Sequence, residues 1–109
     1  MFIQFDEYEL LGLFETEPVS IGEKEEGKFI CSKSDGFGFK LVMVFSIYEK
    51  VCSLSLNHQS YETPILDMKF NDVVKISCNN TQLKIQCNND ANCVIATFKP
   101  NFSINILDL

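Results

Sequence analysis

The chain has 109 residues, 46% of them apolar, and a formal net charge of −6. It contains lysine but no arginine. This length predicts a single domain over residues 1–109, and the apolar fraction excludes a disordered chain. Phosphate and anionic lipid surfaces bind clustered basic side chains, so the charge argues against nucleic acid and membrane as partners.

The first predicted elements are a short helix and a short strand. Asp6 and Glu9 have the spacing of a helix capping box. The apolar face of the helix would consist of Leu10, Leu11 and Phe14. Pro18 ends this segment, and the alternation in residues 19–21 then predicts a strand.

The most apolar stretch, residues 37–56, predicts a central antiparallel hairpin. Its first strand contains the run 41–47, broken only by Ser46, and this run predicts burial on both faces. In the returning strand, apolar residues alternate with serine and asparagine, which indicates one solvated face. A strand around residues 28–33 and a turn at residues 34–36 precede this hairpin.

Residues 65–70 predict a further strand, and Pro64 before it favours an edge position. Residues 74–78 and 83–87 predict a hairpin with a four-residue loop, pairing Cys78 with Leu83, Ile76 with Ile85 and Val74 with Cys87. In that register Cys78 and Cys87 are not opposite each other, which argues against a disulfide between them.

A turn at residues 88–92 and strands at 94–98 and 102–106 complete the chain. The pattern predicts an all-β, mainly antiparallel fold, either a β-sandwich or a flattened barrel of eight or nine short strands with a short N-terminal helix.

The residue types that carry catalysis are sparse. His58 is the sole histidine and follows a predicted strand, where a surface histidine is common. The pairs Glu15/Glu17 and Asp67/Asp72 flank turns, where carboxylates are usually solvated. These observations predict a protein that is not an enzyme and needs no cofactor.

The cysteines are five, an odd number with irregular spacing and without the paired spacing of a zinc site: Cys31, Cys52, Cys78, Cys87 and Cys93. Three of them, Cys52, Cys78 and Cys87, occupy core-facing positions, where free cysteine behaves as a small apolar residue. The N-terminus also lacks the features of a signal peptide. We therefore expect no metal site and a cytoplasmic location.

The negative charge is concentrated in the first quarter of the chain. Residues 1–26 hold eight acids and one lysine, a net −7, whereas the other 83 residues hold seven acids and eight lysines, a net +1. Two interpretations stay open: a solvated face that keeps the protein soluble, or a surface that attracts a basic partner.

Three aromatic residues near predicted turns, Phe37, Tyr48 and Tyr61, also have two interpretations. They either cover the ends of the fold or act as exposed anchors of a protein interface.

The chain resembles small bacterial immunity proteins, which are encoded beside polymorphic toxins such as those of contact-dependent growth inhibition. The resemblance extends over about residues 13–106 and is carried by LFETEP (13–18), DGFGFKLVMVFSIYEKVCSLSL (35–56), VVKISCNNTQLKIQC (73–87) and FKPNFSINI (98–106). It implies a protein that binds its cognate toxin domain one-to-one in the cytosol and blocks its active site or substrate approach. Many such toxins are basic nucleases, so the resemblance implies a nuclease or ribonuclease as partner.

The candidate partner-binding residues are seven of the eight acids of the first quarter, with three weaker candidates: Asp6, Glu7, Glu15, Glu17, Glu23, Glu25, Glu26, Tyr48, Asp67 and Asp72. The alternative function is a small-molecule or carbohydrate-binding β-sandwich. A homodimer through paired edge strands also stays open.

Overall fold

The computed structural model describes residues 2–88 and 92–107. Its helical elements are α1 (Glu7–Phe14) and the short 3₁₀ helix η1 (Lys24–Glu26). The strands in this part of the chain are β1 (Val19–Ser20), β2 (Lys28–Ser34), β3 (Phe39–Ser46), β4 (Val51–His58), β5 (Leu66–Phe70), β6 (Val73–Cys78), β7 (Gln82–Cys87), β8 (Asn92–Thr97) and β9 (Ser103–Ile106).

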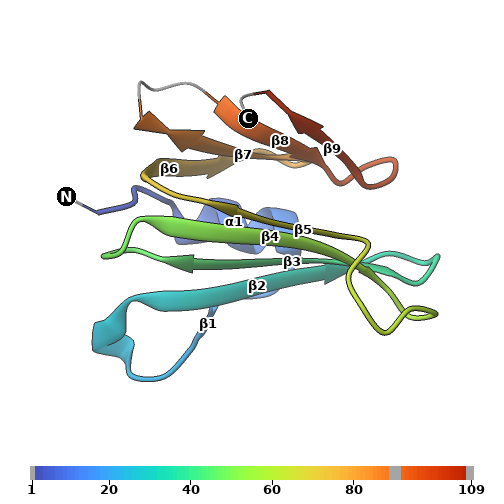
Figure 1. Cartoon of the computed structure of the whole chain (residues 1–109), viewed down its shortest axis with the longest axis horizontal. Coiled ribbons are helices and arrows are strands. Elements are labelled where there is room, and N and C mark those ends of the chain that lie inside the picture. The colour runs from blue at the N-terminus through green and yellow to red at the C-terminus, as the bar shows by residue number, and fades with distance from the viewer. Residues whose placement is uncertain (1, 89–91, 108–109) are drawn as a thin grey trace.

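The nine strands form two antiparallel sheets (Figure 1). One has the order β1-β2-β3-β4-β5 and the other β6-β7-β8-β9, so within each sheet every strand pairs with its neighbours in sequence. The prediction of a mainly antiparallel β fold with eight or nine short strands is confirmed, and two separate sheets fit the sandwich rather than the flattened barrel. Across the described residues, no helix has the length and apolarity that crossing a membrane requires.

Both sheets and α1 contribute to one hydrophobic core. The largest fully buried side chains come from α1, β3, β4, β6, β7 and β8: Leu10, Leu13, Phe14, Leu41, Met43, Phe45, Leu54, Val73, Ile76, Leu83, Ile85 and Val94. The helix contacts β2 of one sheet and β6 of the other, and therefore spans the seam between them (Figure 1).

The apolar face of α1 differs from the predicted one. The buried residues are Leu10, Leu13 and Phe14, whereas Leu11 is 37% exposed. Positions i, i+3 and i+4 lie on one side of a helix, while a residue at i+1 points about 100° away from it. The prediction for Leu11 was therefore wrong, and its side chain is free to line a surface feature.

The central hairpin is confirmed, but β3 is not buried on both faces. Leu41, Met43 and Phe45 are buried, while Val42 and Val44 between them are half-buried and point away from the core. Alternation of this kind is the pattern of an antiparallel sheet with one face against the core.

The predicted register of β6 and β7 holds at two of its three pairs. Cys78 pairs with Leu83 and Ile76 with Ile85, but Cys87 pairs with Val73 instead of Val74 because the ladder is irregular between Val73 and Lys75. The N-terminal segment also pairs with β6 at this point, where the Gln4 N–H donates to the Val74 carbonyl at 3.0 Å.

A disulfide joins Cys87 to Cys93, with 6.1 Å between their Cα atoms. This corrects the prediction of Cys87 as a free core cysteine. The two strands are neighbours, and the pair Gln86–Asn92 lies beside both cysteines. Cys78 is free, as the hairpin register predicted. The predicted turn at 88–92 includes residues 89–91, which lie outside the described residues.

Candidate partner-binding surface

Helix α1 is fixed at both ends by acidic residues. At its start, Asp6 is the N-cap, and its Oδ1 accepts from the backbone N–H groups of Tyr8 at 2.8 Å and Glu9 at 3.4 Å. The second half of the predicted capping box is absent, because Glu9 Oε1 accepts instead from the Cys78 N–H at 3.2 Å. Asp6 and Glu9 thus set the start of the helix and tie it to β6.

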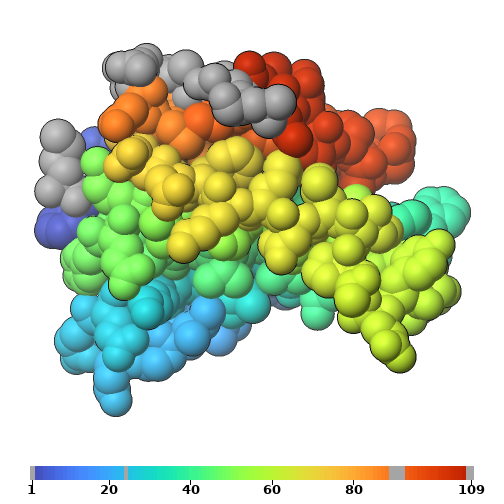
Figure 2. Space-filling view, in the orientation of Figure 1, coloured from blue at the N-terminus to red at the C-terminus, as the bar shows by residue number. Residues whose placement is uncertain are grey.

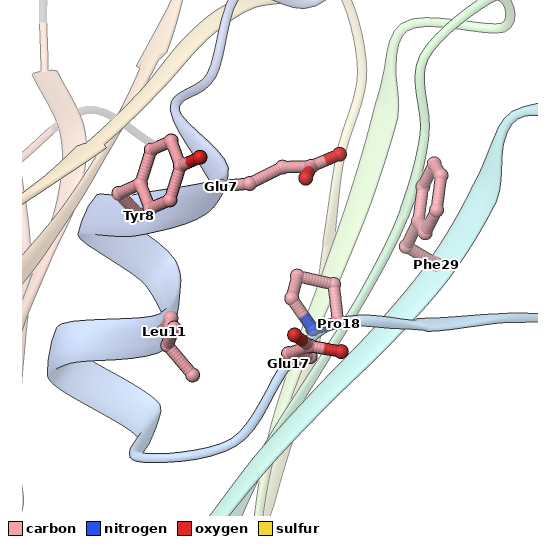
Figure 3. Close-up of a pocket in the computed structure, with 6 residues that line it drawn as sticks. All are labelled: Glu7, Tyr8, Leu11, Glu17, Pro18 and Phe29. Carbon is pink, nitrogen blue, oxygen red and sulfur yellow. The ribbon is translucent and has the colours of Figure 1, made fainter.

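At the other end, Glu15 is the C-cap in the left-handed conformation, with φ 64°. This residue reverses the chain, and the pairing of β1 with β2 then fixes the path of the following residues. As a result, Glu17 and Pro18 lie opposite the exposed side of α1 (Figure 3).

A pocket of about 210 Å³ lies between this side of the helix and β2; we name it the helix pocket. Its six lining residues are Glu7, Tyr8, Leu11, Glu17, Pro18 and Phe29. Figure 3 shows the Glu7 side chain extending from the helix toward Phe29, and Glu17 beside Pro18. Pro18 and Phe29 are half-buried, whereas Tyr8 is 85% exposed. The pocket thus combines apolar walls with the carboxylates of two exposed glutamates, Glu7 and Glu17.

The two carboxylates of the helix pocket have no cation beside them within the described part of the chain. The ion pairs found there join Lys33 to Glu15, and Lys28 to Glu49 at 4.0 Å. The charge of Glu15 is therefore compensated, while Glu7 and Glu17 are exposed and have no ion-pair partner among the side chains that the structure describes.

A second acidic group lies at one end of the five-stranded sheet. Glu23, Glu25 and Glu26 are exposed in the connection from β1 to β2. Tyr48 lies next to this connection, because a Cβ built on Gly27 would come within 2.8 Å of its ring. Figure 2 shows this end on the left of the molecule, formed by the blue and light-blue N-terminal quarter and the green β3–β4 turn.

Tyr48 is 53% exposed, and its ring packs edge-on against Phe2 with 4.9 Å between ring centroids. Asp72 lies in the turn between β5 and β6, which joins the same end: the next residue, Val73, donates its N–H to the Lys50 carbonyl at 2.9 Å. Asp67 is on β5, at the opposite edge of the sheet from β1.

The ten predicted site residues therefore fall into separate places. The structure brings Glu7 and Glu17 together in the helix pocket and places Tyr48 beside the acidic connection at 23–26. Asp6 caps the helix, Glu15 is in an ion pair, and Asp67 is remote from both groups.

Four residues of the helix pocket were not predicted as site residues: Tyr8, Leu11, Pro18 and Phe29. The sequence contains a signal that could have identified two of them, Tyr8 and Leu11. With Leu10, Leu13 and Phe14 on the buried stripe of α1, helical periodicity leaves Tyr8 and Leu11 on the exposed side. Phe29 could not be found this way, since it belongs to a strand that meets the helix only in the fold.

The opposite end of the molecule carries an aromatic group around Phe39, His58 and Tyr61. The His58 ring is 4.6 Å from Phe39 and 5.6 Å from Tyr61, measured between ring centroids. A pocket of about 400 Å³ beside it is lined mostly by polar residues and Phe39: Ser34, Asp35, Gly36, Gly38, Phe39, Lys40, Asn57, His58 and Gln59. In Figure 2 the loops around residues 36 and 61 project at this end.

Both ring nitrogens of His58 are used within the protein. The Ser60 N–H donates to Nδ1 at 3.1 Å, so the ring proton lies on Nε2, which donates to the Phe37 carbonyl at 3.0 Å. His58 therefore holds the loop at 36–38 against the loop at 58–61.

The free cysteines are poor nucleophiles. Burial raises the pKa of the Cys31 thiol to about 12, and burial together with the Glu9 charge raises the pKa of Cys78 to about 12 as well. Burial raises the pKa of Cys52 further. Thiolate is the reactive form, so these side chains stay protonated at neutral pH. Over residues 2–88 and 92–107, no three metal-ligating side chains converge.

Searches for related proteins matched neither a family model nor a curated protein sequence. Among solved structures, the chain is similar to one from a contact-dependent growth inhibition toxin–immunity protein complex of Klebsiella pneumoniae 342. The TM-score is 0.77 at 24% sequence identity, and the similarity covers 96% of each chain. The protein therefore has, over nearly its whole length, the fold of a chain from a toxin–immunity complex.

Proposed function

We propose that the protein is an immunity protein that binds and neutralises the toxin domain of a contact-dependent growth inhibition system. The observation that supports this most is the full-length likeness in fold to a chain of such a toxin–immunity complex. It agrees with the resemblance that the sequence motifs carry independently.

A toxin–immunity complex contains a toxin and its inhibitor, and the chemistry of this chain favours the role of the inhibitor. The histidine and the free cysteines are poorly placed for catalysis: His58 holds two loops together through both ring nitrogens, and burial keeps the free thiols protonated. The exposed features are instead acids and aromatic side chains, which suit protein–protein recognition.

The toxin that we propose as partner is a nuclease. A nuclease needs a basic surface to bind its phosphate substrate. The first quarter of this chain, with its net charge of −7, is complementary to such a surface. Binding there would place carboxylates where phosphates otherwise lie and would block substrate approach, in the cytoplasm and with one-to-one stoichiometry.

Growth rescue with co-purification tests the proposal. The C-terminal domain of the neighbouring upstream gene product is expressed with and without this protein. We expect this protein to rescue growth and to co-elute with the toxin domain at the mass of a one-to-one complex. A harmless neighbour, or a toxic one that is neither rescued nor bound, would contradict the proposal.

The second candidate function is small-molecule or carbohydrate binding at the polar pocket beside His58. Its support is the convergence of hydrogen-bonding groups from two loops around Phe39. A ligand that binds only the native state raises the melting temperature. A thermal-shift screen of sugars and metabolites therefore separates the two functions, since an immunity protein should respond to none of them.

A further inference from the structure

We propose that the helix pocket receives an arginine side chain of the partner protein. This inference rests on the proposed function for the identity of that protein, but the chemistry of the pocket stands on its own geometry. The stacking surfaces and the two carboxylates come from three separate segments of the chain, α1, the residues after it and β2.

The walls of the pocket suit a flat, apolar-sided cation. Tyr8 and Phe29 offer aromatic surface, and Leu11 and Pro18 offer aliphatic surface. A guanidinium group is planar, weakly hydrated for a cation, and stacks on aromatic rings, whereas an ammonium group is compact and strongly hydrated. The methylene stem of arginine can lie along the same apolar walls.

The carboxylates supply the charge complement. Glu7 extends from the first turn of α1, and Glu17 belongs to the segment after the helix, so two acids from different segments line one pocket (Figure 3). The planar fork of guanidinium can donate to both, which a single ammonium point charge does less well.

Among the side chains that the structure describes, no lysine lines this pocket or pairs with its two glutamates. Lys33, on the neighbouring strand β2, is already paired with Glu15. An anionic ligand is disfavoured by the two like charges. A positively charged group from outside the molecule is the chemistry that completes the pocket.

Exposure of the surrounding residues explains why a macromolecule rather than a free metabolite would supply that group. Tyr8 is 85% exposed and Val19, next to Pro18, is 60% exposed. Both would be covered by a partner surface that carries the arginine, and buried aromatic anchors of this kind contribute strongly to interfaces.

The test uses the isolated protein and a small probe, Nα-acetyl-arginine amide, followed by ¹H–¹⁵N NMR at low ionic strength. We expect shifts localised to the backbone amides of residues 7–17 and of Phe29, with the corresponding lysine amide binding several-fold more weakly. The double variant Glu7→Gln/Glu17→Gln should weaken arginine binding by roughly tenfold.

The matched control is Glu49→Gln/Glu62→Gln, which removes the same two charges from glutamates at exposed positions of the β3–β4 turn and of the β4–β5 loop. It should leave binding nearly unchanged. An absence of localised shifts would overturn the proposal, because the pocket would then bind no arginine. Equal losses of arginine affinity in the two double variants would also overturn it, because the effect would then come from bulk charge.

Because this titration needs no toxin, its outcome is independent of the growth-rescue result. Localised arginine binding without rescue would support the pocket and reject the partner. Rescue without arginine binding would support the function and reject this pocket as an arginine site.

Discussion

Gly12 and Gly27 illustrate how single residues shape the candidate surface. Gly27 has φ +68°, and an added Cβ would come within 2.8 Å of the Tyr48 ring. Gly12 lies in α1, and an added Cβ would meet no atom within 4 Å. The first glycine is therefore required by its backbone and its neighbour, while the second only weakens its helix.

The two Gly→Ala substitutions should change stability in opposite directions. Gly12→Ala should raise the free energy of unfolding by about 0.5 to 1 kcal/mol, because alanine is the better helix former. Gly27→Ala should lower it by more than about 1 kcal/mol through left-handed strain and displacement of Tyr48. Urea unfolding measures both, and a loss of stability in Gly12→Ala would show that the helix is held differently.

The acidic residues show what sequence can and cannot reveal at this scale. Counting charges was enough to find the acidic first quarter. It could not separate Asp6, which caps a helix, or Glu15, which pairs with Lys33, from Glu7 and Glu17, which form no ion pair with any side chain that the structure describes. That division depends on residues distant in sequence that meet only in the fold.

At the scale of elements, alternation predicted the strands well because each has one face against the core. It failed where an element receives contacts from elsewhere. In β6, strict alternation placed Val74 in the core, but the structure buries Val73 completely and leaves Val74 half-exposed. The irregularity lies where Gln4 pairs with β6, and no pattern within residues 73–78 could reveal that partner.

A matched pair of substitutions tests this register. Val73→Ala should lower the free energy of unfolding by about 1 to 3 kcal/mol, because it leaves a cavity in a packed core. Val74→Ala should cost less than about 1 kcal/mol, since its side chain is only half-buried. If urea unfolding gave the reverse order, the alternation predicted from sequence would hold and the irregular ladder would be wrong.

At the scale of the whole molecule, the two acidic groups should act on a partner in different ways. The helix pocket would act at contact range, through the arginine it holds. The acids at 23–26 are exposed at the end of the sheet, and their field extends to a distance set by ionic strength. The Debye length falls from about 30 Å at 0.01 M salt to about 8 Å at 0.15 M.

Association kinetics with the toxin domain can therefore separate field from contact. The triple reversal Glu23→Lys/Glu25→Lys/Glu26→Lys adds two charges at each site and takes the formal net charge from −6 to 0. It should slow association at low salt by about tenfold or more and flatten the salt dependence, with little change in dissociation.

The pocket variant Glu7→Gln/Glu17→Gln should chiefly speed dissociation, because it removes a contact while changing the net charge by only two. Stopped-flow mixing measures the association rate, and a displacement chase measures the dissociation rate.

If the triple reversal left low-salt association unchanged, the acidic connection would be a solvated face without a role in steering. If it instead changed dissociation as strongly as the pocket variant does, the interface would extend to that end of the sheet.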